Sequence, residues 1–207
     1  MLKQYEELKK KYKVENLLND HKELIFVLES PHVDELLNQA PVSGLSGKAM
    51  SKVIFGDEEK TPIGIKTKKE PTSKIGIMNI CSIPMQRAAY VNEDVEKMYG
   101  SFDVETYNSF FDIVEKLRTG TKEKYKDSLR NDMQDVILAD FKNELNKLKD
   151  KELVIIPCGK TAEVFFGIAG VKSDKWTVMQ GVAHPSFGNW YKEKYKISVE
   201  KIKELTK

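Results

Sequence analysis

The sequence has few cysteines and no long apolar run, and both absences narrow the classes of protein it can belong to. Its two cysteines, Cys81 and Cys158, lie far apart and form no CxxC pair. This pattern argues against a disulfide framework and a structural zinc site, and it fits a reducing cytosol. The longest apolar runs are about five to six residues, whereas roughly 20 are needed to span a membrane. We therefore expect a cytoplasmic protein with no membrane partner.

An excess of charge of one sign is also missing. The formal net charge is +2, from 34 basic and 32 acidic residues. Bulk charge therefore neither demands nor excludes a nucleic-acid partner. Lysines gather at residues 60–74 and 192–207, where a solvated surface is the simpler interpretation and a nucleic-acid surface the alternative. The three histidines lack paired ligand spacing, so no metal site is predicted.

The pattern of apolar residues predicts an α/β fold. The length of 207 residues suits a single domain, 1–207, with a sizeable core. Four apolar stretches predict strands, at residues 24–28, 75–81, 153–157 and 176–183. Helical patterns separate them, which predicts a three-layer α/β/α sandwich with a central four-stranded parallel sheet.

The predicted helices fill most of the remaining chain. A charged amphipathic helix is expected first, which argues against a signal peptide. The expected helices cover residues 2–19, 34–37, 49–55, 102–117, 129–148, 161–166 and about 189–205. Residues 56–74 are rich in charge and contain two prolines and two glycines, which predicts a long exposed loop. The helical insert at about 102–148 is interpreted either as extra scaffold or as a partner surface.

The stretch ELIFVLESPH, residues 23–32, is the most informative part of the chain. Five apolar residues predict a buried strand, and Pro31 ends it because proline cannot donate to a ladder. Ligands in open α/β sheets bind beyond the carboxyl ends of the strands. Glu29, Ser30 and His32 are therefore candidate site residues. The simpler interpretation is that Glu29 caps the next helix and His32 is a solvated loop residue.

Two other predicted strands also end in polar residues. Asn79 lies near the end of the second strand, and His184-Pro185-Ser186 follows the fourth. Parallel strands deliver these groups to one edge of the sheet, so they are expected to converge with Glu29 on one crevice. Other sites fit less well: the Gly159-Lys160-Thr161 turn lacks the first glycine of a P-loop, and no serine has the G-x-S-x-G turn of hydrolases.

The order of these motifs resembles the uracil-DNA glycosylase superfamily, nearest to its iron–sulfur branch. The matching segments are LESP (28–31), GLSGKA (44–49), IMNI (77–80), CGKTA (158–162) and HPS (184–186). They resemble the family segments G-E-A-P, P-F-V-G-R-A, I-T-N-V, L-G-x-x-A and H-P-S. The branch has four cluster-ligating cysteines and this chain has two, so we predict no iron–sulfur cluster and no other cofactor. Leu45 stands where the family carries an aromatic residue that stacks on uracil.

The resemblance implies a role for each matched residue. Glu29 and His184 are the expected catalytic residues. The expected substrate-binding residues are Ser30, Pro31, His32, Leu45, Asn79 and Ser186. The expected DNA-binding residues are Gly44, Ser46, Gly47, Lys48, Phe187 and Trp190. For the two aromatic residues among them, ordinary packing is the alternative to a wedge between bases.

The implied chemistry is hydrolysis of an N-glycosidic bond in DNA that contains a deaminated base, by a monomeric enzyme. A carboxylate stabilises the cationic sugar, and a histidine donor stabilises the leaving base. An amide such as Asn79 can read the base edge, because it presents both a donor and an acceptor. Two other functions stay open: an inactive nucleotide or single-strand binding module of the same fold, and a hydrolase of free nucleosides or nucleotides.

Overall fold

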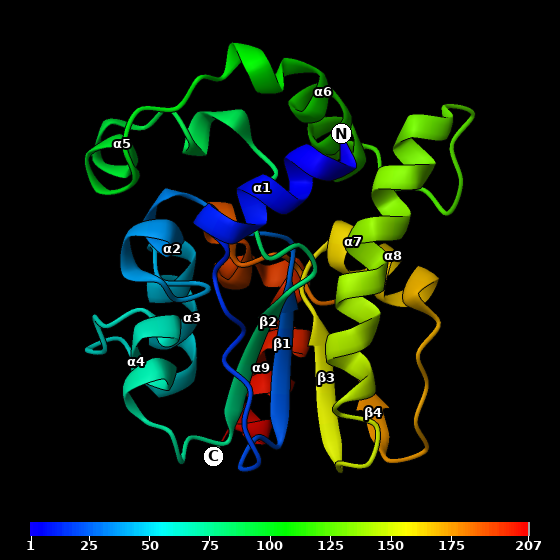
Figure 1. Ribbon diagram of the computed structural model, residues 1–207. Helices are drawn as coiled ribbons and strands as arrows, with labels where there is room; N and C mark the ends of the chain where they lie inside the picture. Colours follow the sequence, from blue (N-terminus) through cyan, green and yellow to red (C-terminus); the bar gives the residue numbers. More distant parts are fainter. Residues whose placement is uncertain (207) are drawn as a thin grey trace.

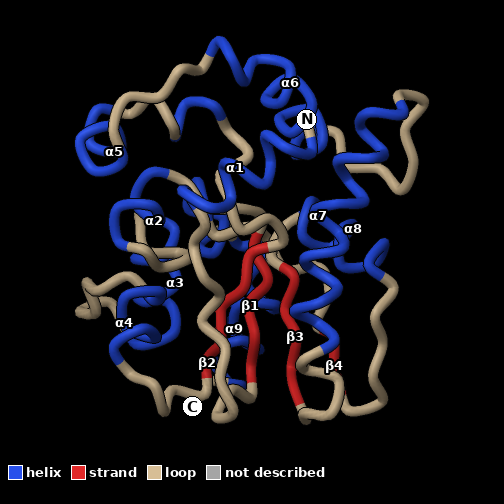
Figure 2. Tube along the Cα trace, in the orientation of Figure 1, coloured by secondary structure: helices blue, strands red, loops and turns tan. Residues whose placement is uncertain are grey.

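A four-stranded parallel sheet forms the centre of the computed structural model, which describes residues 1–206. Lys207, the last residue of the expected domain and of its second lysine cluster, lies outside the described residues. The strand order is β2-β1-β3-β4. The strands are β1 (Leu24–Leu28), β2 (Ile75–Asn79), β3 (Leu153–Pro157) and β4 (Trp176–Val178). The predicted four-stranded parallel sheet is confirmed, and β1 lies between two other strands (Figure 2).

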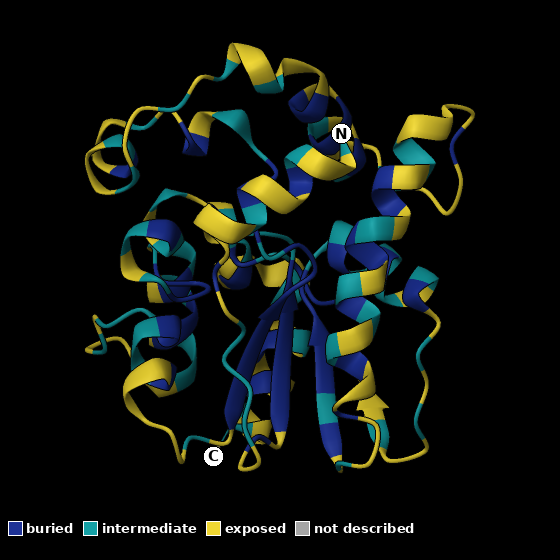
Figure 3. Cartoon of the chain, viewed as in Figure 1, coloured by how far each residue is buried: buried dark blue, intermediate teal, exposed yellow. Residues whose placement is uncertain are grey.

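Helices cover both faces of the sheet, which gives three layers (Figure 1). Ile25 and Val27 of β1 pack on the face covered by α1, α7 and α8, whereas Phe26 packs on the face covered by α3 and α9. This alternation follows from the pleat of a strand. Strands β1, β2 and β3 are almost completely buried, whereas the edge strand β4 is partly exposed (Figure 3). The side chains of the three buried strands carry much of the hydrophobic stabilisation.

The helices are interleaved with the strands along the chain. The α-helices are α1 (Leu2–Tyr12), α2 (Val33–Asn38), α3 (Leu45–Phe55), α4 (Ile63–Lys69), α5 (Glu93–Tyr99), α6 (Asn108–Thr119), α7 (Ser128–Asn146), α8 (Lys160–Ala169) and α9 (Lys196–Leu205). Short 3-10 segments are η1 (Arg87–Ala89), η2 (Glu105–Tyr107), η3 (Ser186–Tyr191) and η4 (Glu193–Tyr195). No helix of residues 1–206 is both long and apolar enough to cross a membrane.

Several predicted elements are shorter than expected, among them the second strand, which ends at Asn79 rather than residue 81. The first helix ends at Tyr12 rather than near residue 19, because the following segment runs beside β2 and Leu17 exchanges backbone hydrogen bonds with Ile77. The fourth strand ends at Val178 rather than residue 183, although the Met179 N–H still donates to the Ile155 carbonyl at 2.9 Å and Val182 bridges to Cys158. Regular strand pairing therefore stops before the HPS motif.

The prediction of a long exposed loop at residues 56–74 is wrong, because this segment contains α4. Ile63 is fully buried, and Gly64 donates its N–H to the Val42 carbonyl at 3.2 Å. A Cβ at Gly64 would lie 1.8 Å from the Pro41 carbonyl oxygen, so only glycine allows this contact. The helix thus supports the loop at residues 41–44.

Two other helix boundaries differ from expectation. The glycine-bearing loop ends at Gly44, since α3 already begins at Leu45 rather than Ala49. The last predicted helix, residues 189–205, is instead η3, η4 and the shorter α9. Phe187 and Gly188 have φ values of 55° and 61°, and this left-handed pair interrupts helical geometry.

Candidate functional site

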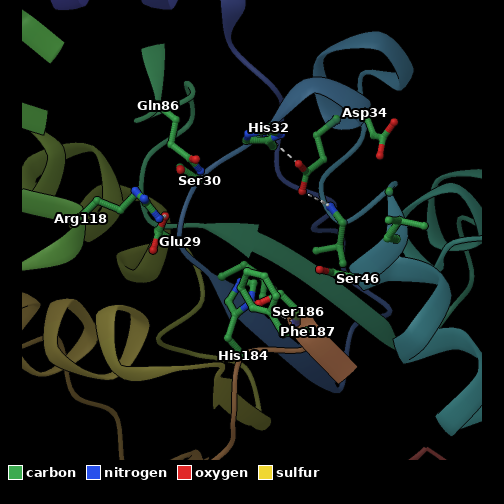
Figure 4. A pocket seen from close by; sticks show the side chains of 15 residues that line it. Glu29, Ser30, His32, Asp34, Ser46, Gln86, Arg118, His184, Ser186 and Phe187 are labelled. Atoms are coloured by element: carbon green, nitrogen blue, oxygen red, sulfur yellow. Dashed lines mark hydrogen bonds and ion pairs between the residues drawn. The ribbon is translucent and has the colours of Figure 1, made fainter. Parts of the chain in front are cut away.

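A cavity of about 530 Å³ lies beyond the carboxyl end of β1 (Figure 4). Its walls come from the β1–α2 connection, the start of α3, the end of α6 and the HPS segment. The lining residues are Leu28, Glu29, Ser30, His32, Asp34, Glu35, Val42, Gly44, Leu45, Ser46, Gln86, Arg118, His184, Ser186 and Phe187. Nine predicted site residues therefore share one cavity: Glu29, Ser30, His32, Gly44, Leu45, Ser46, His184, Ser186 and Phe187.

Glu29 is held at the floor of this cavity by the central position of β1. Its backbone carbonyl accepts a hydrogen bond from the Cys81 N–H at 3.1 Å, which fixes the chain just after the strand. Its side chain is 18% exposed, and Oε1 lies 3.4 Å from Nη1 of Arg118. Burial raises the pKa of the Glu29 carboxyl, and the Arg118 guanidinium offsets part of that rise. A carboxylate with a raised pKa is suited to act as a base.

The ring of His184 has a defined tautomer. Its Nδ1 accepts the backbone N–H of Ser186 at 3.2 Å and lies 2.8 Å from the Ser186 Oγ. Because Nδ1 is an acceptor, the proton of the neutral ring is on Nε2. Burial, reinforced by the positive charge of Arg118, lowers the pKa of His184, so the ring is neutral at pH 7. His184 is therefore a neutral N–H donor at the cavity.

Gly159 allows the HPS segment to approach the sheet. It has φ +91°, and a Cβ here would lie 2.8 Å from Cβ of His184. Its N–H donates to the carbonyl of Val182 at 2.8 Å. Both the left-handed backbone and the close approach require glycine. The glycine of the CGKTA turn thus positions the histidine of the HPS motif.

Glu35 connects two walls of the cavity. Its Oε2 accepts the His32 N–H at 2.6 Å and its Oε1 accepts the Val42 N–H at 2.9 Å, as the dashed lines of Figure 4 mark. Burial raises the pKa of Glu35 to about 7. Val42 has φ 52°, which is strained for a β-branched residue and costs on the order of 1 kcal/mol. The Glu35 carboxylate therefore stabilises a backbone conformation that is unfavourable for Val42 by itself.

The rim carries two exposed apolar side chains. Leu45, the first residue of α3, is 80% exposed, and Phe187 in η3 is 91% exposed. Lys48 is exposed and does not line the main cavity, but it lines an adjoining one together with Gly44 and Leu45. Because both side chains line the same cavity, they are candidates for contact with a ligand or partner.

Asn79 is not among the residues that line this cavity. It lines a second cavity, beside α1 and α7, and is 3% exposed. Neither its Nδ2 nor its Oδ1 has a hydrogen-bond partner within residues 1–206. Its register partner is Leu28, which lines the first cavity, so the two side chains belong to the same face of the sheet. The expected convergence of three strand ends is thus confirmed for Glu29 and His184 only.

Three other predicted site residues are buried in the fold and do not line the cavity. Trp190 is 3% exposed, stacks near Phe26 with ring centroids 5.9 Å apart, and donates Nε1–H to the Ala183 carbonyl at 2.8 Å. It belongs to the core, and a wedge role for it is wrong. Gly47 is buried where a Cβ would lie 1.9 Å from the Val42 oxygen, so it serves packing. Pro31 is buried and does not line the cavity.

The sequence interpretation missed Arg118, Gln86, Asp34 and Glu35, which all line the cavity. Arg118 is 89 positions from its partner Glu29, and no local pattern marks it among the other charges of its helix. Glu35 could have been found, since it follows His32 by three residues, the spacing of a capping box. No group of three or more metal-ligating side chains occurs within residues 1–206.

Comparison with known proteins gave no matching family model and no matching curated protein. The chemistry of the cavity is therefore the guide to the function of this chain.

Proposed function

We propose that this protein hydrolyses the N-glycosidic bond of uracil, or of a related deaminated base, in DNA, with a fold of the uracil-DNA glycosylase type. One observation carries the proposal: a buried carboxylate, Glu29, and a neutral imidazole donor, His184, line one cavity from separate parts of the chain. These are the two groups that cleavage of such a bond requires.

Glu29 acts on the sugar. As the bond to the base lengthens, the sugar gains positive charge, and a nearby carboxylate stabilises it. The same carboxylate orients a water molecule and takes its proton when the water attacks. The raised pKa of Glu29 supports this second role, because a stronger base accepts the proton more readily.

His184 acts on the leaving base. The base departs as an anion, and its negative charge collects on a ring oxygen. A neutral Nε2–H donor aimed at that oxygen stabilises the charge, and such preorganised donors are typically worth roughly 3–4 kcal/mol. The Ser186 N–H and the lowered pKa of His184 support this role, since both favour the tautomer that donates from Nε2.

Base recognition is assigned to Asn79 and Ser30. The Asn79 amide and the Ser30 Oγ are both buried without a hydrogen-bond partner in the described chain, which is costly unless a ligand supplies one. An amide offers a donor and an acceptor together, as a uracil edge requires. The support for Asn79 is its unpartnered amide and its sheet face, since it does not line the cavity.

We assign contacts with DNA to the residues at the rim of the cavity. A base inside a duplex must leave the stack to enter a cavity of this kind, and an apolar side chain can fill the gap. Phe187, which is 91% exposed beside His184, is the candidate for that contact. Ser186, Ser46 and the backbone at Gly44 are candidates for phosphate contacts, with Lys48 beside them.

The test is uracil release from a fluorescent oligonucleotide with one uracil, where alkali cleaves the resulting abasic site. Wild type is expected to cut, and Glu29→Gln and His184→Gln are expected to lose roughly 10²–10⁴-fold in rate. The matched controls are Glu204→Gln and His21→Gln, which change exposed residues of the same types. If micromolar wild type leaves uracil, hypoxanthine and xanthine untouched in both single and double strands, the proposal is wrong.

A second candidate is a module that binds a nucleotide or single strand without cleaving it. The observation that favours it is Leu45, an aliphatic residue on the rim where a stacking aromatic is expected to add roughly 1–3 kcal/mol per base. This candidate predicts salt-dependent DNA binding with no base release.

A further inference from the structure

The helical segment after β2 supplies one charged residue to the cavity. Arg118, in the last turn of α6, is the one Lys or Arg among the described lining residues. Its Nη1 lies 3.4 Å from Oε1 of Glu29, and Figure 4 shows the two side chains pointing toward one another. A segment outside the matched motifs therefore contributes directly to the site.

Contacts at the end of α6 fix the backbone of Arg118 and so limit the positions of its side chain. Its carbonyl accepts a hydrogen bond from Oγ1 of Thr161 at 3.1 Å, in the first turn of α8. The preceding residue, Leu117, is fully buried in the core. The end of α6 is thus tied to the same turn whose Gly159 supports His184. The turn at residues 159–161 therefore supports both Arg118 and His184.

The contact between Arg118 and Glu29 is not that of a closed structural ion pair. Structural pairs between arginine and a carboxylate are commonly bidentate, with distances of about 2.7–2.9 Å. Here a single contact of 3.4 Å joins them, and the Nε of Arg118 is buried with no partner within residues 1–206. The guanidinium keeps donors free and leaves the Glu29 carboxylate open to the cavity.

Arg118 changes the protonation of two titratable groups in the cavity, Glu29 and His184. The other titratable groups that line the cavity are His32, Asp34 and Glu35 from α2 and its cap, and His184 from the HPS segment. The charge of Arg118 lowers the pKa of both Glu29 and His184.

We propose that Arg118 is a positioning residue that keeps Glu29 as an oriented carboxylate and His184 as a neutral donor. Its consequence for catalysis rests on the proposed function, whereas the charge coupling among the three residues does not. The proposal also gives α6 a role at the site, beyond that of scaffold.

The first test is an NMR titration that needs no substrate. The Glu29 carboxyl is followed by ¹³C and the His184 ring by ¹⁵N, with Glu29→Gln and His184→Gln used for assignment. Arg118→Met should raise the pKa of Glu29 by about one pH unit and also raise that of His184. Arg118→Lys should restore most of both values, and Lys116→Met, an exposed charge on the same helix, should change neither. If Arg118→Met leaves both titrations where wild type has them, the proposal is wrong.

The second test is the pH profile of single-turnover uracil release. Arg118→Met should move the acidic limb to higher pH by about one unit, which lowers the rate on that limb by roughly tenfold, and Arg118→Lys should recover it. A rate loss with an unmoved acidic limb would indicate a merely structural role and overturn the proposal. If Arg118→Met does not fold, as judged by circular dichroism, Arg118→Gln takes its place. Absence of uracil release in wild type would defeat the proposed function alone, because the titration still decides the role of Arg118.

Discussion

Two cavities lie near the carboxyl end of the sheet, and they differ in how far their charged side chains are paired with one another. In the second cavity, of about 440 Å³, Lys13 lies 2.7 Å from Glu15 and Lys147 lies 2.6 Å from Glu144. Lys9 likewise pairs with Asp140. In the first cavity the Glu29 carboxylate has one ion-pair contact among residues 1–206, at 3.4 Å, and the Nε2 of His184 has no hydrogen-bond partner there.

The difference separates charges that stabilise the fold from charges that can do chemistry. The charged side chains of the second cavity satisfy one another, so they leave little free capacity for a ligand. In the first cavity, burial moves the pKa of Glu29 up and that of His184 down. Buried titratable groups with shifted pKa values that share a cavity are typical of functional sites. We therefore assign function to the first cavity and a structural role to the charges of the second.

The largest expected effect is at Glu29. Glu29→Gln should reduce uracil release by roughly 10²–10⁴-fold while leaving the free energy of unfolding at pH 8 unchanged or higher. The pKa of Glu29 is raised in the folded state, so its ionised form costs stability above the unfolded pKa, and glutamine removes that cost. Single-turnover assays and urea unfolding measure both quantities. A large loss of stability would show that Glu29 stabilises the fold, as the paired charges of the second cavity do.

The second-largest expected effect is a pH dependence of the free energy of unfolding, which arises from Glu35. Its pKa rises from 4.5 to about 7 on folding. Between these values the folded state binds more protons than the unfolded state, so stability falls as pH rises. From pH 4.5 to 7.5 this fall is on the order of 2–3 kcal/mol. Urea unfolding of wild type and Glu35→Gln at both pH values should show a flatter dependence in the variant. Glu204→Gln, on exposed α9, is the control and should match wild type.

A smaller effect is expected in the second cavity, at Asp140. The buried hydroxyl of Tyr5 donates to Oδ2 of Asp140 at 2.9 Å, and Lys9 also pairs with that oxygen. Asp140→Ala removes the acceptor and should lower stability by about 1–2 kcal/mol, with uracil release unchanged. The control is Asp135→Ala, an exposed residue on the same helix. Loss of activity without loss of stability would reverse the comparison between the cavities.

The smallest effect concerns the rim. Phe187→Ala should change the free energy of unfolding by less than about 0.5 kcal/mol, because its side chain is 91% exposed. It should weaken binding of uracil-containing DNA by about fivefold, from the loss of about 1 kcal/mol of base contact. Ile197→Ala, which is 89% exposed on α9, is the control and should leave binding unchanged. Equal binding by the two variants would remove Phe187 from the proposed interface.

Local patterns predicted strand bounds best for the short apolar runs in the centre of the sheet. The strands at residues 24–28 and 153–157 match their predicted bounds, since each is a short apolar run in the core of the sheet. The fourth strand was predicted too long because it is an edge strand with partly exposed side chains, which dilutes the apolar signal. Helix α4 was missed because its lysines suggested a loop, whereas the contact between Gly64 and Pro41 holds it in place.

The sequence by itself determined which groups stand at the strand ends. Glu29 and Ser30 follow the apolar run of β1 directly, and the chain needs no distant contact to place them there. The tertiary structure alone decided the strand order β2-β1-β3-β4, which puts Glu29 at the centre of the sheet edge. It also decided that Arg118 reaches Glu29 across 89 positions. Such contacts depend on packing between helices and sheet, which local sequence patterns do not encode.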